Sequence, residues 1–153
     1  MKSEVKELPE FNVVFIRKIG SYIFTCRQAF EELMKWAIPR NYVGPKKVLG
    51  IYWDNPEVTP VDKCRFDACI IVPDGFTVDD NLQTQKLWGG TYAVCNFELK
   101  PEEMSKAYEK SFAWVCESGY EFKDKPCFEL YHNNAAEHPE GKWIFDICIP
   151  LKR

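Results

Sequence analysis

An internal repeat is the feature that most constrains the fold of this chain: short segments of the first half recur, in the same order, in the second half. Two of the three matches lie at the same offset of 79 residues and the third at 78. One short match would arise by chance, whereas three in one order at nearly one offset indicate two copies of one supersecondary unit. The matching pairs are Ala29–Glu31 with Ala107–Glu109, Ile51–Asn55 with Leu130–Asn134, and Phe66–Ile70 with Phe145–Ile149.

Each copy predicts a strand, then a helix, then two further strands. The strand segments are rich in β-branched and aromatic residues, whereas Cys26, Phe30 and Leu33 recur at helical spacing. In the second copy, Pro101 suits the first helical position and Gly119 is typical of a helix end. The predicted strands are 12–19, 48–53, 64–72, 91–99, 127–132 and 143–151, and the predicted helices are 23–37 and a segment between 101 and 119.

This order predicts an α+β fold of two strand-helix-strand-strand modules, about 11–73 and 89–152, with pseudo-two-fold symmetry in a single domain over 1–153. Asp74–Leu87 is polar and aperiodic, so we expect it to link the modules, and we expect the fold to start near Phe11. Each antiparallel sheet would carry its helix on one face and turn the other face toward its twin. The two sheets would then enclose a central cleft, a preferred place for ligand sites.

Strand alternation predicts that one acidic residue, Glu129, faces the cleft. Successive side chains of a strand point to opposite faces, so we expect Phe128 and Leu130 to face the helix, with Glu129 and Tyr131 in the cleft. The repeat sets Gly50 against Glu129, which leaves a small space beside one negative charge. A cationic ligand would offset the cost of burying that charge. Alternation alone favours the other interpretation, a Glu129 on a solvated sheet face, because most Glu side chains are exposed.

The tryptophans have both core and pocket interpretations. Trp36 and Trp114 occupy matching helix positions and are expected to be packing residues. Trp88 precedes a pair of glycines and Trp143 opens the last strand. For both, a place in the core and a place in the pocket are equally consistent with the sequence.

Composition argues against several classes of function. The net charge is −3, from 20 basic and 23 acidic residues without a concentrated basic face, so we expect no direct binding of nucleic acid. No apolar run approaches the roughly 20 residues that cross a bilayer, and no signal-type segment occurs, so we expect a cytoplasmic protein without membrane contact. Seven cysteines without CxxC and two histidines without zinc-site spacing predict neither disulfides nor a metal. Without a nucleotide or nucleophile motif, we expect no cofactor.

Three segments of the chain carry a further signal: Ile51–Pro60, Gly89–Val94 and Lys125–Tyr131. They resemble, in the same order, motifs of the GyrI-like family, also called the AraC-type effector-binding domain, and the resemblance extends from about Phe11 to Lys152. It implies two strand-helix-strand-strand (SHS2) modules, the architecture that the repeat also predicts. In that family the domain often follows a DNA-binding module in transcription regulators that sense drugs, and this chain resembles a stand-alone member.

The resemblance also implies a site and a function. Glu129 matches the family's acidic pocket residue, which implies that it faces a ligand. The leading function that follows is binding of hydrophobic, aromatic or cationic small molecules, in multidrug sensing or sequestration. Stand-alone members imply two alternatives: a hydrolase of cyclopropane-bearing DNA-alkylating compounds, with Glu129 as catalytic residue, and a protein-interaction inhibitor such as a gyrase modulator. The candidates for the aromatic walls of the pocket are Tyr52, Trp88, Tyr92, Tyr131 and Trp143.

Overall fold

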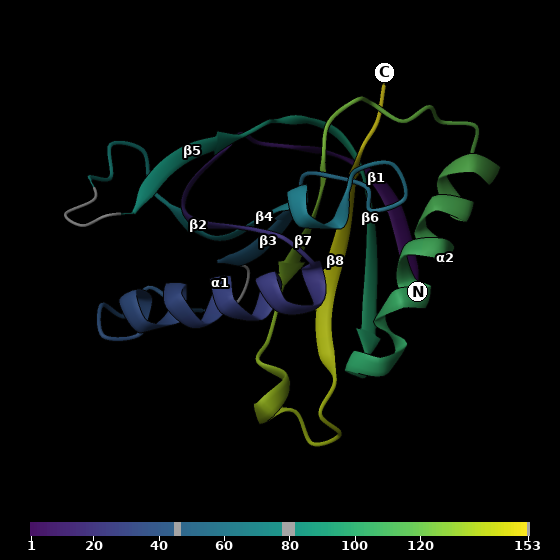
Figure 1. Ribbon diagram of the computed structural model, residues 1–153. Helices are drawn as coiled ribbons and strands as arrows, with labels where there is room; N and C mark the ends of the chain where they lie inside the picture. The colour runs from purple at the N-terminus through teal and green to yellow at the C-terminus, as the bar shows by residue number, and fades with distance from the viewer. Residues whose placement is uncertain (45–46, 78–81, 153) are drawn as a thin grey trace.

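The computed structural model describes residues 1–44, 47–77 and 82–152, which fold into one open antiparallel sheet with two helices (Figure 1). The sheet order is β1-β6-β8-β7-β3-β4-β2-β5. This arrangement confirms the predicted α+β class and the two strand-helix-strand-strand modules, β2-α1-β3-β4 and β6-α2-β7-β8. The elements are β1 (Lys2–Leu8), β2 (Phe11–Ile19), α1 (Tyr22–Ala37), β3 (Val48–Tyr52), β4 (Arg65–Val72), β5 (Gln83–Leu87), β6 (Gly90–Leu99), α2 (Met104–Glu117), β7 (Cys127–Tyr131) and β8 (Trp143–Pro150).

The two modules join edge to edge, because β3 of the first pairs with β7 of the second. Gly50 is the direct partner of Glu129 in this pairing. These are the same two residues that the 79-residue offset makes equivalent, so the pseudo-two-fold axis of the fold passes between them. The modules therefore form one continuous sheet, and not the two facing sheets that sequence analysis expected.

Both helices lie on the same face of this sheet, where they diverge from each other (Figure 1). The helix α1 packs on β2 and β4, and α2 packs on β6 and β8. The opposite face carries no helix, yet it is also a core, since it buries apolar residues from both modules. Its fully or almost fully buried members include Val13, Leu49, Ile51, Cys69, Tyr92, Phe128 and Cys148.

The prediction for the two faces of β7 was wrong. Phe128 lies in the core of the helix-free face and Leu130 packs against that core, whereas Glu129 and Tyr131 contact residues of α2 and α1. Alternation divides a strand into two sets of side chains but does not say which set faces a helix. Here both faces of the sheet are apolar, so the more apolar set of β7 did not mark the helix side.

Sequence analysis also missed the two edge strands. β1 was expected to precede the fold, and β5 was assigned to the link between the modules, of which residues 78–81 lie outside the described residues. Both strands are polar and largely exposed, so neither has the apolar run that predicts a strand. Backbone pairing with β6 and β2 defines them instead, and charged side chains are typical of edge strands because they discourage pairing with further chains.

Gly50 is required by close packing at the centre of the sheet. A Cβ atom built on Gly50 would lie 2.9 Å from Cζ of Phe66 and 3.4 Å from Cζ of Phe30. Phe66 is fully buried, so its ring has little room to move. The space that a side chain at position 50 would occupy is therefore filled by two rings of the first module, on the face that carries Glu129.

We expect Gly50→Ala to lower the free energy of unfolding by about 1–3 kcal/mol, the usual cost of overpacking a core. Urea unfolding followed by circular dichroism measures this change. Gly44→Ala is the matched control, because its Cβ would meet only the flexible Lys47 side chain at 3.6 Å. Its expected effect is within about 0.5 kcal/mol, and equal stability of the two variants would contradict the packing argument.

Candidate functional site

A groove runs along β3 and β7, between α1 and α2, as three adjoining hollows. The central hollow, of about 980 Å³, lies between the first turns of both helices and contains Glu129. A smaller inner hollow of about 380 Å³ continues past Tyr131 toward Met34. An outer hollow of about 960 Å³ continues toward Phe112 on α2 and the loop after β3. The central and inner hollows share Cys26, Arg27, Tyr52, Met104 and Trp143, and the central and outer hollows share Tyr22, Tyr52, Ser105 and Tyr108.

Glu129 is the acidic group of this groove and is only 2% exposed. Its Oε2 accepts a hydrogen bond of 2.5 Å from the Tyr108 hydroxyl, and its Oε1 accepts one of 2.7 Å from the Tyr131 hydroxyl. Tyr108 comes from α2 and Tyr131 from the same strand as Glu129, two residues further on the same face. The carboxyl is thus held by phenol groups alone, and among the described residues no salt bridge neutralises it.

Burial raises the pKa of Glu129 above its usual value of 4.5, because the charged form loses its hydration. Hydrogen bonds from Tyr108, Tyr131 and Tyr52 favour the ionised form and oppose this shift without cancelling it. Such a carboxyl has two chemical uses. Protonated, it can donate a proton, and ionised, it offers an unpaired negative charge to a cation in a site of low polarity.

Aromatic rings surround the carboxyl on both sides. The Tyr131 ring packs edge-on against Phe30 of α1 at 5.7 Å between centroids, and against Trp143 at 5.5 Å. Tyr52 packs against Tyr108 at 6.2 Å. Burial raises the pKa of the Cys26 thiol to about 11, so this thiol stays protonated and acts as part of the apolar wall.

The structure brings together four of the six residues predicted for the site and separates the other two. Tyr52, Tyr131 and Trp143 line the groove together with Glu129. Tyr92 instead belongs to the core of the helix-free face, where its hydroxyl donates to the Trp88 carbonyl. Trp88 packs against the same core, so the structure places both residues outside the groove. Alternation along β6 fixes the face of Tyr92, but sequence alone did not establish which face the groove occupies.

Sequence analysis did not single out Tyr108 as a site residue. A signal for it existed in the repeat, because Tyr108 is the counterpart of Phe30 at the 78-residue offset. The second copy thus adds a hydroxyl on its helix and a carboxylate on its strand, and these two additions meet at 2.5 Å.

Two structural findings concern metal ions and membranes. Within residues 1–44, 47–77 and 82–152, no group of three or more His, Cys, Asp or Glu side chains is placed to bind a metal ion. In the same part of the chain, no helix is long and apolar enough to cross a membrane.

The sequence of this chain is similar to a known family of small-molecule binding domains. The sequence profile of the GyrI-like small molecule binding domain matches residues 1–152. A relative from Escherichia coli (strain K12), named DNA gyrase inhibitor, is 33% identical over 99% of this chain and 98% of its own length. A relative of the same name from Salmonella typhimurium is 30% identical over 100% of this chain and 99% of its own length.

Solved structures share the fold at lower sequence identity. The EcmrR C-terminal domain has a TM-score of 0.74 at 17% identity, over 99% of this chain and 98% of that chain. SAV2435, solved with tetraphenylphosphonium bound, has a TM-score of 0.66 at 15% identity, over 99% and 94%. A hydrolase from Listeria innocua has a TM-score of 0.73 at 12% identity, over 99% and 92%.

We expect Glu129→Gln to be more stable than the wild type at neutral pH. A carboxyl whose pKa is raised by folding stabilises the folded state fully below about pH 4.5, and loses that contribution as the pH rises through the folded pKa. Glutamine does not titrate. The stability advantage of the variant should therefore grow above pH 4.5, by up to about 1.4 kcal/mol per pH unit, and then level off.

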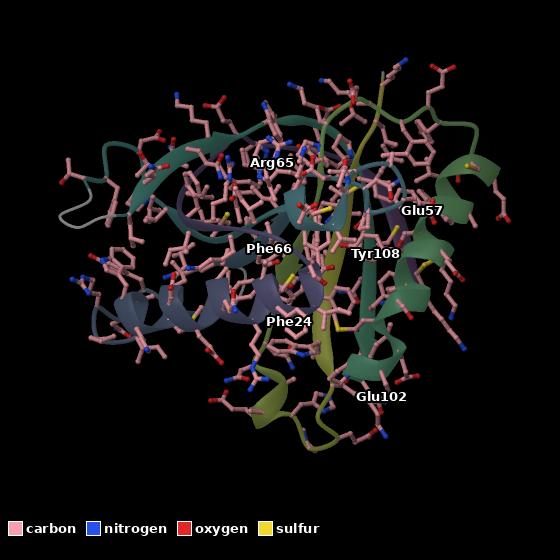
Figure 2. All side chains as sticks on the ribbon, in the orientation of Figure 1. Phe24, Glu57, Arg65, Phe66, Glu102 and Tyr108 are labelled. Atoms are coloured by element: carbon pink, nitrogen blue, oxygen red, sulfur yellow. The ribbon has the colours of Figure 1, made fainter. Side chains whose placement is uncertain are left out.

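Urea unfolding of both proteins between pH 4 and pH 8 measures this difference. The control is Glu102→Gln, which removes an exposed carboxylate at the start of the α2 segment (Figure 2). The control should keep a constant difference from the wild type. A pH-independent difference for Glu129→Gln as well would show that the Glu129 pKa is not raised.

Proposed function

This chain belongs to the GyrI-like family, and we propose that its groove binds small molecules that are hydrophobic and aromatic and carry a positive charge, for sensing or sequestration of such compounds. The observation that carries the proposal is Glu129, a buried carboxyl in an aromatic groove that has no salt-bridge partner among the described residues. A buried charge is destabilising unless it is paired. A cationic ligand would supply the missing partner.

The groove walls fit the same ligand chemistry. Rings of Tyr52, Tyr131 and Trp143 line the hollows beside the carboxyl. Tyr and Trp rings attract cations by roughly 0.5–2 kcal/mol each, more strongly where water is excluded. Tetraphenylphosphonium, the compound bound to SAV2435, is a cation enclosed by aromatic rings. The fold similarity to that protein supports this choice of ligand as the first probe.

We expect tetraphenylphosphonium to bind the wild type and to bind Glu129→Gln about 10- to 100-fold more weakly, because the variant loses the attraction between two opposite charges. A loss of about 1.4–2.8 kcal/mol corresponds to this range, and unit charges about 5 Å apart near a protein surface attract by roughly 3 kcal/mol. Isothermal titration calorimetry measures both affinities, with Glu102→Gln as the control that retains binding. Equal affinity of wild type and Glu129→Gln would reject recognition of the positive charge.

Binding should also depend on pH, because only ionised Glu129 attracts the cation. Affinity is expected to increase as the pH rises through the raised pKa of Glu129 and then to become constant. Tyr131→Phe removes a hydrogen bond that lowers this pKa, so the midpoint of the affinity profile should move to higher pH. A flat affinity profile between pH 5 and pH 8 in both the wild type and Tyr131→Phe would contradict the role of Glu129.

A second candidate function is inhibition of a protein partner, favoured by the relatives named DNA gyrase inhibitor at 33% and 30% identity. A supercoiling assay with purified gyrase tests it, in the presence and absence of a saturating groove ligand. If the wild type and Glu129→Gln inhibit gyrase equally, the inhibition would use a surface separate from the groove.

The hydrolase alternative is favoured by one property of Glu129, a carboxyl whose pKa is raised by burial and which lies beside two phenol groups. Such an acid can protonate a conjugated carbonyl oxygen while water attacks the cyclopropane carbon, the ring C–C bond breaks and its electron pair moves toward that oxygen. The proton that the attacking water loses then returns the carboxylate to its acid form. Consumption of a cyclopropane-bearing aromatic substrate, with a loss of kcat that exceeds the change of KM in Glu129→Gln, would support it. Binding of that compound without product would reject it.

A further inference from the structure

The outer hollow is the largest apolar feature of the groove that the proposed function leaves unused. It has a volume of about 960 Å³ and lies between α2 and the loop that follows β3. Two rings of its wall, Phe112 and Phe122, are 37% and 39% exposed. Tyr52 and Tyr108 border both this hollow and the central one, so the two spaces adjoin at that pair of rings.

A continuous series of aromatic contacts leads from Glu129 into the outer hollow. Tyr108, which donates to the Glu129 carboxyl, packs against Phe112 one helical turn later at 6.2 Å between centroids. Phe112 in turn packs against Phe122 at 5.5 Å. A flat or apolar ligand that reaches Glu129 would therefore find ring surface along the whole way to the outer end.

The rim of the outer hollow is acidic. Glu57, in the loop after β3, and Glu109, on α2, both line the hollow and are exposed. Figure 2 shows Glu57 near α2 and above Tyr108. In the described part of the chain, neither carboxylate takes part in a salt bridge.

Two further charged groups of the outer hollow are already engaged. Asp54 accepts two hydrogen bonds from the Arg65 guanidinium, at 3.0 Å each. Lys125 holds its Nζ over the Trp88 ring, 4.8 Å from the centroid. The charges left for a ligand at this rim are therefore negative.

We propose that the outer hollow is a second subsite, which takes the second positively charged aromatic end of an elongated ligand. The ligand class is a bis-cationic aromatic compound: one end lies against Glu129, an apolar linker crosses the Tyr52–Tyr108 pair, and the other end lies between Phe112 and the acidic rim. The inference rests on the proposed function, because it extends the site that Glu129 defines. The charge complementarity of Glu57 and Glu109 selects this occupant over a neutral one.

The test compares two probes that share one ring system. Dequalinium carries two aminoquinaldinium rings on a decamethylene linker, and N-decyl-4-aminoquinaldinium carries one ring on the same alkyl chain. In titration calorimetry, the wild type should bind dequalinium at least tenfold more tightly than it binds the single-headed probe. The double variant Glu57→Gln/Glu109→Gln should weaken dequalinium by about three- to tenfold, since exposed charge pairs contribute little each, and should leave the single-headed probe unchanged.

Two other variants separate local recognition from a general effect of charge. Phe112→Ala removes a half-exposed ring of the subsite and should weaken dequalinium alone. Glu117→Gln, an exposed carboxylate of α2 outside the hollow, is the matched control and should change neither probe. Equal affinities of the two probes for the wild type, or equal losses for both in the double variant, would overturn the subsite.

The outcome also separates this inference from the proposed function. If the single-headed probe binds in a Glu129-dependent manner and dequalinium gains nothing, the subsite is rejected while the proposed function stands. If neither probe binds, both are rejected.

Discussion

The site of this protein depends on one unfavourable feature, the burial of the Glu129 carboxyl at the centre of the sheet without a salt bridge to any residue that the structure describes. Removal of Glu129 from water raises its pKa, and hydrogen bonds from phenols stabilise the ionised form only in part. The fold tolerates this cost because the surrounding rings hold the group in place from both modules. Under the proposed function, the same feature would make the groove selective, since a ligand with a positive charge would pair with the buried carboxylate and a neutral ligand would not.

The position of Glu129 follows from the duplicated architecture. Gly50 and Glu129 are equivalent in the repeat and are also direct partners across β3 and β7, so any side chain at either position lies on the pseudo-two-fold axis. There is room for one such side chain. Phe66 and Phe30 occupy the space above Gly50, and the second module fills the axis with a carboxyl and the Tyr108 hydroxyl. Departure from symmetry at the axis thus produces the chemistry of the site.

On the helix-free face the two modules stay alike: each carries a carboxylate with polar side-chain partners, although the partners differ. Asp67 accepts hydrogen bonds from Arg17 at 2.7 Å and from the Trp53 indole at 2.7 Å. Its counterpart Asp146 accepts one from Asn96 at 2.9 Å and lies 2.8 Å from His132 Nε2. Both carboxylates have polar partners, and neither needs a ligand. Glu129 accepts side-chain hydrogen bonds from the phenols of Tyr108 and Tyr131, and it is the carboxyl on which the proposed recognition of a cation rests.

The sequence by itself determined the duplicated strand-helix-strand-strand order, the position of most elements and the pairing of Gly50 with Glu129 as equivalents. These are properties of local propensity and of the offset, and both can be read from neighbouring residues. Tertiary structure alone decided which face of β7 meets the helices, that the modules join along an edge, and that β1 and β5 complete the sheet. Each of these depends on contacts between distant segments: a strand with two apolar faces does not reveal its outer side, and a polar edge strand exists only through the backbone of its neighbour. For that reason Tyr92 and Trp88 were predicted in the groove and lie outside it, while Tyr108, which sequence analysis did not single out, donates a hydrogen bond to the carboxyl.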